Sequence, residues 1–399
     1  MHRTLSEEDA AFQQRMRDFF TTEVPQDIRD RWRAGGEVEA QDVRVTQRIL
    51  NAAGLAVPSW PREFGGQDWT NLQLHIYLQE MQSASVPPPL AFNVNMVGPV
   101  IAAFASRELK ERFLSPTANL DIWWAQGFSE PEAGSDLASL RTSAVLEGDE
   151  WVVNGQKTWT TLGQHADWIF ALVRTDPDAP KKQMGISFLL IDMATPGVTV
   201  RPIQLIDRGH EVNEIFFDNV RVPVDQLVGE VNKGWDYAKF LLGNERVSVA
   251  PVGSIKRKLA DAKGFARSVA TDDGTLLDDV HIATRFAELE AQVMALELTA
   301  LRVAAGSKDG KPDPASSILK LRGSQLQQDV LELVVDLAGP SGLLWDAGDT
   351  RDGTDGSGRE AWTGKAAPTY LNFRKASIYG GSNEVQRQII SSGILGLRG

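Results

Sequence analysis

A pair of motifs between residues 123 and 161 constrains the fold of this chain more than any other feature. The first, residues 123–136, is an apolar, Trp-rich run that breaks into Ser, Pro, Gly and Asp. This order is typical of a strand that ends in a tight polar turn, whose backbone N–H groups can bind a carbonyl or phosphate oxygen. The second, residues 151–161, alternates in polarity and contains Asn154-Gly155, which predicts a hairpin.

Trp159 and Thr161 are the residues of the second motif that suggest a ligand. They lie two positions apart, so an extended strand would project both from one face. An indole beside a hydroxyl suits a flat heteroaromatic ligand with hydrogen-bonding edges. A purely structural interpretation, a β-domain with an aromatic core and a capped turn, explains the same residue types. The residues alone leave both interpretations open.

The two motifs also carry a resemblance. The run QGFSEPEAGSD (126–136), followed by NGQKTWTT (154–161), resembles the flavin-contacting part of the acyl-CoA dehydrogenase family. The similarity extends over nearly the whole chain, from about Phe12 to Leu397. The resemblance implies FAD as the cofactor, an acyl-CoA thioester as the substrate, and no metal.

Site residues are carried over from the family position by position. The residues that match flavin contacts are Gln126, Phe128, Ser129, Trp159 and Thr161. Ser135 and Arg246 match positions near the CoA moiety. Tyr379 and Ser382 match the C-terminal wall of the site, Tyr379 on the substrate side and Ser382 on the cofactor side.

The chemistry that the resemblance implies is α,β-dehydrogenation of the thioester. It needs a carboxylate shielded from water to remove the α-proton, because desolvation raises the carboxyl pKa towards the working pH. In many relatives this carboxylate follows the Tyr of a C-terminal motif, but here Gly380 follows Tyr379. The long-chain and isovaleryl branches place the glutamate on an earlier helix, where this chain has Glu245.

The spacing around Glu245 supports that assignment. Leu241, Leu242 and Val249 lie at i−4, i−3 and i+4, so Glu245 shares an apolar helical stripe with them. A carboxylate there is either a poised base or one half of an ion pair with a bundle arginine, and the glycine at 380 favours the base. Gly380 would leave room for the Glu245 side chain, and its N–H would polarise the thioester carbonyl, as a backbone donor does in the family.

Two departures from the family pattern concern the cofactor diphosphate. Relatives carry an R-x-x-F-G motif that reaches the flavin of the neighbouring subunit, whereas this chain has LLDDVHIATRFAELE, with Asp278 and Asp279. A second stretch, Q-x-x-G-G-x-G in relatives, is VVDLAGPSG (334–342) here. The pattern resembles the base-bearing subunit of bacterial α₂β₂ acyl-CoA dehydrogenases. It therefore implies a homologous partner subunit, with a homotetramer as the alternative.

The rest of the chain predicts an α+β multidomain fold. Residues 1–122 indicate an N-terminal helical domain, with Ser6 and Asp9 as a capping pair. Residues 123–232 change to strands without intervening helices, typical of an antiparallel barrel or sandwich, and the resemblance favours the β-barrel. Residues 233–399 predict a four-helix bundle with a mobile Gly-rich loop at 347–365. The expected strands are 151–160, 168–174, 186–192, 198–203 and 214–222, and the expected bundle helices are 235–270, 279–306, 315–337 and 383–394.

Composition excludes several other classes of function. A formal charge of −12 argues against a general nucleic-acid or anionic-membrane binder. The absence of cysteine excludes disulfides, zinc thiolates and thiol nucleophiles, and the five scattered histidines show no metal-ligand spacing. There is no membrane-span pattern and no apolar signal core at the start, so a cytoplasmic protein is expected. No G-x-G-x-x-G occurs, which argues against a Rossmann flavoprotein.

The leading hypothesis is an FAD-dependent acyl-CoA dehydrogenase that makes the trans-2-enoyl-CoA and passes electrons to an electron-transfer flavoprotein. One alternative is a non-catalytic subunit of the same fold that binds acyl-CoA or scaffolds a catalytic partner. Another is a flavin oxidase or monooxygenase. Glu245 and the intact flavin strand favour the dehydrogenase. The sequence leaves the acyl group open, whether fatty, branched, dicarboxylic or steroid.

Overall fold

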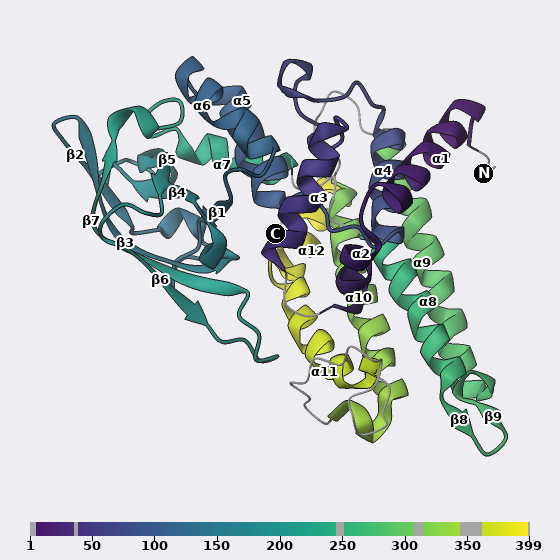
Figure 1. Cartoon of the computed structure of the whole chain (residues 1–399). Helices are drawn as coiled ribbons and strands as arrows, with labels where there is room; N and C mark the ends of the chain where they lie inside the picture. The colour runs from purple at the N-terminus through teal and green to yellow at the C-terminus, as the bar shows by residue number, and fades with distance from the viewer. Residues whose placement is uncertain (1–4, 36–38, 245–250, 307–313, 344–360, 398–399) are drawn as a thin grey trace.

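The computed structural model describes residues 5–35, 39–244, 251–306, 314–343 and 361–397. N-terminal helices come first, a curled sheet follows, and long helices end the chain (Figure 1). This order confirms the predicted fold class. None of the helices within these ranges is long and apolar enough to span a membrane.

The N-terminal part is helical, as predicted. Its helices are α1 (Glu7–Thr22), α2 (Gln26–Ala34), α3 (Ala40–Ala52), α4 (Asn71–Ser83), α5 (Gly98–Phe104) and α6 (Arg107–Ala118). The Ser6 hydroxyl accepts a hydrogen bond from the Asp9 amide at 3.1 Å, which confirms the predicted cap at the start of α1. Phe12, Met16 and Phe20 recur at helical spacing on α1 and are buried, so this face packs into the core.

The sheet is mixed, which corrects the antiparallel prediction. Its strands are β1 (Trp124–Gly127), β2 (Ser143–Glu147), β3 (Glu150–Thr161), β4 (Trp168–Arg174), β5 (Ile186–Asp192), β6 (Val198–Ile203) and β7 (Val212–Pro223). They run in the order β1-β4-β2-β3-β7-β6, and β5 pairs with β4. β4 is parallel to both β1 and β2, while β2–β3, β3–β7, β4–β5 and β6–β7 are antiparallel. The chain from β1 to β4 is long enough to serve as the crossover that parallel pairing requires.

The predicted hairpin at Asn154-Gly155 is wrong. The β2–β3 hairpin instead turns at Gly148, where Glu147 pairs with Glu150. Asn154 and Gly155 lie inside β3, at a shift in its register with β7. Gly155 has φ +145°, and a Cβ there would lie 2.7 Å from the Thr142 Cα. A bulge and a close backbone approach therefore require this glycine, and a tight turn does not.

The C-terminal part contains α7 (Gly234–Asn244), α8 (Val252–Ser268), α9 (Val280–Gly306), α10 (Ser316–Ala338), α11 (Ala361–Phe373) and α12 (Asn383–Gly393). The short strands β8 (Ala270–Thr271) and β9 (Gly274–Thr275) join α8 to α9. The single helix predicted over 235–270 is therefore wrong, because the structure has two helices, α7 and α8, in this range. Pro251 immediately precedes α8, a position where proline is tolerated because its missing N–H is not needed by the first turn of a helix.

The segment predicted as a mobile loop, 347–365, needs a partial correction. Residues 347–360 lie outside the described residues, but 361–365 begin α11. The Trp362 ring stacks on Phe265 of α8, with centroids 4.4 Å apart. This contact packs the start of α11 against α8. The Gly-rich composition of 347–365 gave no indication of such packing.

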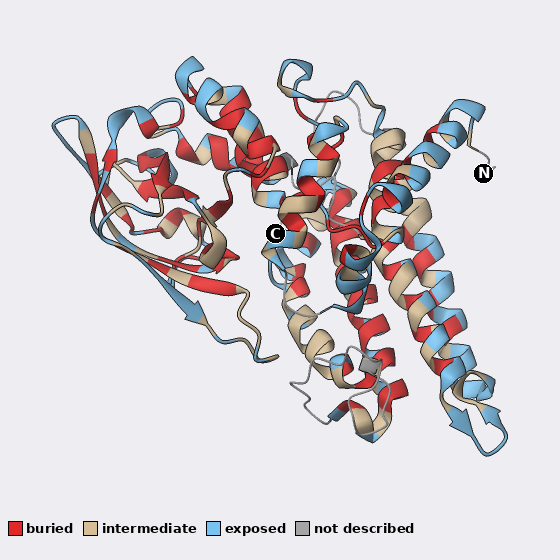
Figure 2. Cartoon of the chain, viewed as in Figure 1, coloured by how far each residue is buried: buried red, intermediate tan, exposed pale blue. Residues whose placement is uncertain are grey.

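Buried side chains form separate cores (Figure 2). One core joins the N-terminal helices to one face of the sheet, and there the Phe113 ring lies 5.3 Å from Trp124 and 4.9 Å from Trp168. Another holds α8–α11 together. Tyr237 and Leu241 of α7 belong to the first core. α7 thus packs with the sheet and the N-terminal helices, although it precedes the bundle in the chain.

Candidate functional site

The two motifs meet where β1 ends. The Thr158 amide donates to the Ser129 carbonyl at 2.9 Å, so the residues after β1 lie beside the last third of β3. Phe128 is buried, with its ring 5.8 Å from Phe170 and 6.2 Å from Phe188, and its carbonyl accepts from Lys157 Nζ at 3.3 Å, so its ring belongs to the core. Gln126 and Ser129 are half-buried. The structure therefore places the Ser129 backbone beside Thr158, the residue that precedes Trp159.

Trp159 is the large exposed side chain of this region. Its exposed fraction is 60%, whereas Thr158 and Thr160 on either side are buried. Its φ of +59° lies in the left-handed region, at a second register shift between β3 and β7. The regular alternation predicted for Trp159 and Thr161 is therefore interrupted, although Thr161 remains half-buried. Left-handed φ in a bulky residue costs of order 1–3 kcal/mol and concentrates at functional sites.

A buried ion pair fixes the turn that carries Ser129. The Lys157 ammonium is fully buried and lies 2.7 Å from Glu130 Oε1. The Glu130 carboxylate also accepts from the amides of Arg141 at 2.6 Å and Thr142 at 2.9 Å. The pair therefore ties both ends of the 129–142 turn to β3, and Ser135 is exposed within it.

Burial shifts the titration of this pair. It lowers the pKa of Lys157 to about 8, against the opposing attraction of Glu130. Burial alone would raise the pKa of Glu130, but Lys157 and the hydrogen bonds from Thr142 and Arg141 outweigh it and hold that pKa below its usual value. Both residues lie in the two motifs at 126–136 and 154–161, but no local spacing pairs residues 27 positions apart, so this ion pair could not be predicted from the sequence.

The C-terminal wall is a turn stabilised from within. Gly380 and Gly381 have φ of +62° and +82°, a region that favours glycine. The Gln386 side-chain amide donates to both of their carbonyls, at 3.4 and 3.2 Å. The Ser382 hydroxyl caps α12 by accepting from the Val385 amide at 3.4 Å. Tyr379 is 52% exposed beside this turn.

Glu245 and Arg246 lie outside the described residues, so their roles stay predictions. The last described residue before them is Asn244, where α7 ends. Within α7, Leu241 is buried and Leu242 is 38% exposed. The site assignments of Gln126, Phe128, Ser129, Ser135, Trp159, Thr161, Tyr379, Gly380 and Ser382 likewise stay predictions.

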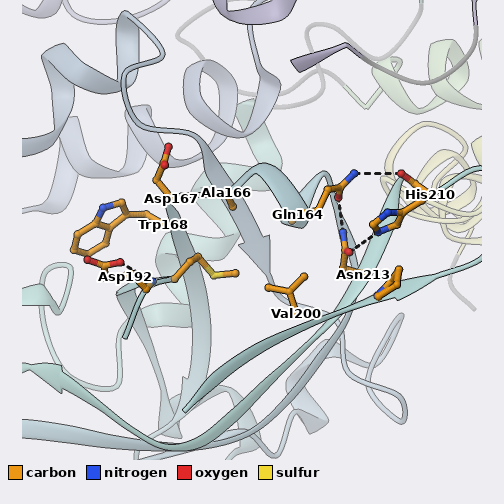
Figure 3. A pocket seen from close by; sticks show the side chains of 12 residues that line it. Gln164, Ala166, Asp167, Trp168, Asp192, Val200, His210 and Asn213 are labelled. Carbon is orange, nitrogen blue, oxygen red and sulfur yellow. Dashed lines mark hydrogen bonds between the residues drawn. The ribbon is translucent and has the colours of Figure 1, made fainter. Parts of the chain in front are cut away.

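A hollow of about 670 Å³, which no sequence pattern predicted, opens beside the end of β3 (Figure 3). Gln164, His210 and Asn213 form a hydrogen-bonded network in its wall. The buried Asn213 amide donates to Gln164 Oε1 at 2.7 Å and to the Thr160 carbonyl at 3.2 Å, and its oxygen lies 2.7 Å from His210 Nε2. These polar groups satisfy one another, so the network braces the end of β3.

Comparison with known families identifies three consecutive matches. They are the acyl-CoA dehydrogenase N-terminal domain at residues 6–121, middle domain at 125–220 and C-terminal domain at 232–395. The chain is 34% identical over 368 residues to the acyl-CoA dehydrogenase IpdE1 of Mycobacterium tuberculosis, covering 91% of this chain and 90% of the relative. The predicted boundaries 1–122, 123–232 and 233–399 stay predictions.

Solved structures are similar over the full length. The ChsE4-ChsE5 complex from Mycobacterium tuberculosis matches with a TM-score of 0.85 and 30% identity, covering 100% of both chains. A structure described as the Tcur3481-Tcur3483 steroid ACAD matches with a TM-score of 0.86 and 28% identity, again covering 100% of both chains.

Proposed function

Because this chain belongs to the acyl-CoA dehydrogenase family, we propose that it binds FAD and dehydrogenates an acyl-CoA to the trans-2-enoyl-CoA. The observation that carries the proposal is the bond between the Ser129 carbonyl and Thr158, which joins the turn that carries Ser129 to the strand segment that carries the exposed, strained Trp159. A broad exposed indole on a segment bonded to a hydroxyl-bearing turn fits a flavin ring. When bound, FAD supplies the acceptor for the β-hydrogen and its electron pair. An electron-transfer flavoprotein is the proposed acceptor of those electrons in turn.

Each predicted residue takes one task in this proposal. Trp159 packs on the flavin, while Gln126, Ser129, Thr161, Ser382 and the backbone of Phe128 hydrogen-bond its edges. Ser135 and Arg246 hold the CoA moiety, and Tyr379 closes the substrate side. The Gly380 N–H binds the thioester oxygen, where charge develops as the α-proton leaves. Glu245 removes that proton.

For the acyl group we propose a bulky chain, with steroid side-chain thioesters ahead of short straight ones. One full-length structural neighbour is described as a steroid ACAD. Gly380 leaves space where many relatives carry a carboxylate side chain. The pathway class would then be β-oxidation of a fatty-acid or sterol side chain.

The direct test is anaerobic reduction of the purified protein, with its partner if one co-purifies. We expect FAD to be present and its visible absorption to bleach with a steroid side-chain acyl-CoA, more slowly with octanoyl-CoA and not with free CoA. Flavin and acyl-CoA binding without bleaching would support the non-catalytic alternative. Hydrogen peroxide formed in air at the rate of turnover would support an oxidase. A protein that never takes up FAD would contradict the proposal.

Assembly gives a separate prediction, because the family's arginine motif is missing. Asp279 Oδ1 accepts from the amides of His281 and Ile282 at the start of α9, and Asp278 binds Thr275. Arg285, the nearby cation, is paired with Asp336 at 2.6 Å. Carboxylates in this position would repel a diphosphate from a second copy of the chain.

We therefore expect the chain expressed alone to be flavin-poor. Co-expression with a homologous chain that keeps the arginine motif should give an α₂β₂ assembly with one FAD for each pair of chains. The measurements are FAD per chain and mass in solution. An active homotetramer with one FAD per chain would overturn the heteromeric assignment.

A further inference from the structure

Hydrogen bonds within the loop between β6 and β7 define its conformation. The Leu205 amide donates to the Gly209 carbonyl at 3.2 Å, and the Gly209 amide donates to Asp207 Oδ1 at 3.1 Å. Arg208 has φ +62° between them. Asp207 thus uses one carboxylate oxygen within the loop and leaves the other for an outside donor.

This loop contacts the end of α11 and the turn that follows it. Asn372 Nδ2 donates to Asp207 Oδ2 at 2.6 Å and to Glu211 Oε2 at 3.1 Å. The Lys375 ammonium lies 2.5 Å from the same Glu211 oxygen. The side chains of Glu211 and Lys375 are only 30% and 27% exposed, so this charge-assisted contact is more shielded than a typical surface ion pair.

On the sheet side, Glu211 is attached to the end of the proposed flavin strand. Its carbonyl accepts from the Leu162 amide at 2.7 Å, and the next residue, Val212, pairs with Thr161. The buried Asn213, which is drawn in Figure 3 with Gln164 and His210, also donates to the Thr160 carbonyl at 3.2 Å. These hydrogen bonds fix the position of the Glu211 backbone relative to residues 160–162 at the end of β3.

On the other side, Lys375 is attached to the C-terminal wall. Its carbonyl accepts from the amides of Ile378 at 2.9 Å and Tyr379 at 3.1 Å. Helix α10 holds the same turn within the bundle, because Lys320 Nζ donates to the Ala376 carbonyl at 2.6 Å and Gln328 Nε2 donates to the Arg374 carbonyl at 3.1 Å. The Glu211–Lys375 contact relates this turn to the sheet.

We infer that Glu211 is a positioning residue, which sets the distance between the flavin strand at Thr161 and the wall at Tyr379–Gly380. The inference rests on the proposed function, since that distance matters only if the cofactor and the thioester lie between the two segments. The Leu162 amide donates to the Glu211 carbonyl, the Lys375 ammonium donates to the Glu211 carboxylate, and the Tyr379 amide donates to the Lys375 carbonyl. Without the carboxylate, the loop keeps the Asn372–Asp207 contact with α11 but loses its ion pair with the turn that leads to Gly380, so the Gly380 N–H is held less firmly in register with the strand.

The first test is a double-mutant cycle on the FAD-loaded enzyme with Glu211→Ala, Lys375→Ala and both together. The matched control is Glu214→Ala, because Glu214 is 26% exposed, lies on β7 and pairs with Gln156 and Arg201 of the sheet alone. We expect Glu211→Ala to lower kcat by roughly 10- to 100-fold, as for a displaced reacting group, with KM and FAD content little changed. Lys375→Ala should lower kcat by no more than Glu211→Ala, because Asn372 still donates to Glu211, and the double variant should be no worse than Glu211→Ala. Glu211→Gln, which keeps the size and one acceptor, should recover part of kcat.

The second readout needs neither cofactor nor turnover. Amide hydrogen exchange in residues 376–382 should speed up in Glu211→Ala and stay unchanged in Glu214→Ala. Unchanged exchange and kcat in folded Glu211→Ala and Glu211→Gln would overturn the inference, as would single losses that multiply in the double variant. If exchange is faster in Glu211→Ala but the wild-type protein turns over no acyl-CoA, the proposed function is contradicted, while the role of the Glu211 contact in holding the turn is supported.

Discussion

Glu245→Gln is expected to lower the rate of dehydrogenation by roughly 10²- to 10⁴-fold, the contribution of a positioned general base, while FAD stays bound. Glutamine keeps the size and polarity of the side chain but cannot accept the α-proton. The motivation is the apolar stripe that Glu245 shares with Leu241, together with the glycine at 380. The measurement is the single-turnover rate of flavin reduction by a saturating acyl-CoA.

The control for this variant is Glu290→Gln, which makes the same charge change on the bundle. Glu290 pairs with Lys263 at 2.5 Å and is 48% exposed, so its loss should leave the rate of flavin reduction unchanged. If Glu245 instead belongs to a structural ion pair, Glu245→Gln should lower the melting temperature and leave the reduction rate near normal. That result in a flavin-loaded protein would refute the assignment of the base.

Lys157→Met is expected to destabilise the protein by about 3–5 kcal/mol, the typical effect of removing one partner of a buried ion pair. Lys157 has no exposed surface, and its removal leaves the Glu130 carboxylate without its cation in the same low-dielectric region. The turn that carries Ser129 then loses its attachment to β3. The measurement is the free energy of unfolding in urea, with FAD content as a second readout.

Two comparisons make the Lys157 result specific. Arg141 and Glu132 form an ion pair in the same turn with side chains 80% and 72% exposed, so Arg141→Met should cost no more than about 1 kcal/mol. Lys157→Met combined with Glu130→Gln should recover part of the loss, because no unpaired charge stays buried. If Lys157→Met and Arg141→Met lower the free energy of unfolding by the same amount, the buried ion pair contributes no more to stability than the exposed one.

Local patterns were sufficient for the order of the parts. Helical spacing of Phe12, Met16 and Phe20 and the Ser6 cap predicted α1, and short strand-like runs separated by turn residues predicted β4, β5 and β6 with their observed bounds. These features depend on residues a few positions apart, which is the range over which backbone geometry repeats. The motifs at 126–136 and 154–161 likewise indicated the family, because many of its ligand contacts lie within short stretches.

Pairing between distant strands was decided by the tertiary structure. Asn154-Gly155 has the composition of a hairpin turn, yet the approach of Thr142 places it in a bulge. The parallel β1–β4 pair joins Trp124 to Trp168 across a whole hairpin, and no periodicity in either strand specifies its direction. The same holds for α7, whose Leu241 is buried against the sheet and N-terminal helices, although its residue types suit a bundle helix equally well.

For the site, the sequence by itself determined which residue types are present: the indole of Trp159, the hydroxyl of Ser129, a glycine at 380 and a glutamate at 245. Only the tertiary structure decided how the described ones are held. Lys157 meets Glu130 from 27 positions away, and Glu211 meets Lys375 from 164 positions away. Such contacts depend on where whole elements dock, because a charged side chain pairs with whatever the fold brings within about 4 Å, and sequence spacing carries no record of that distance.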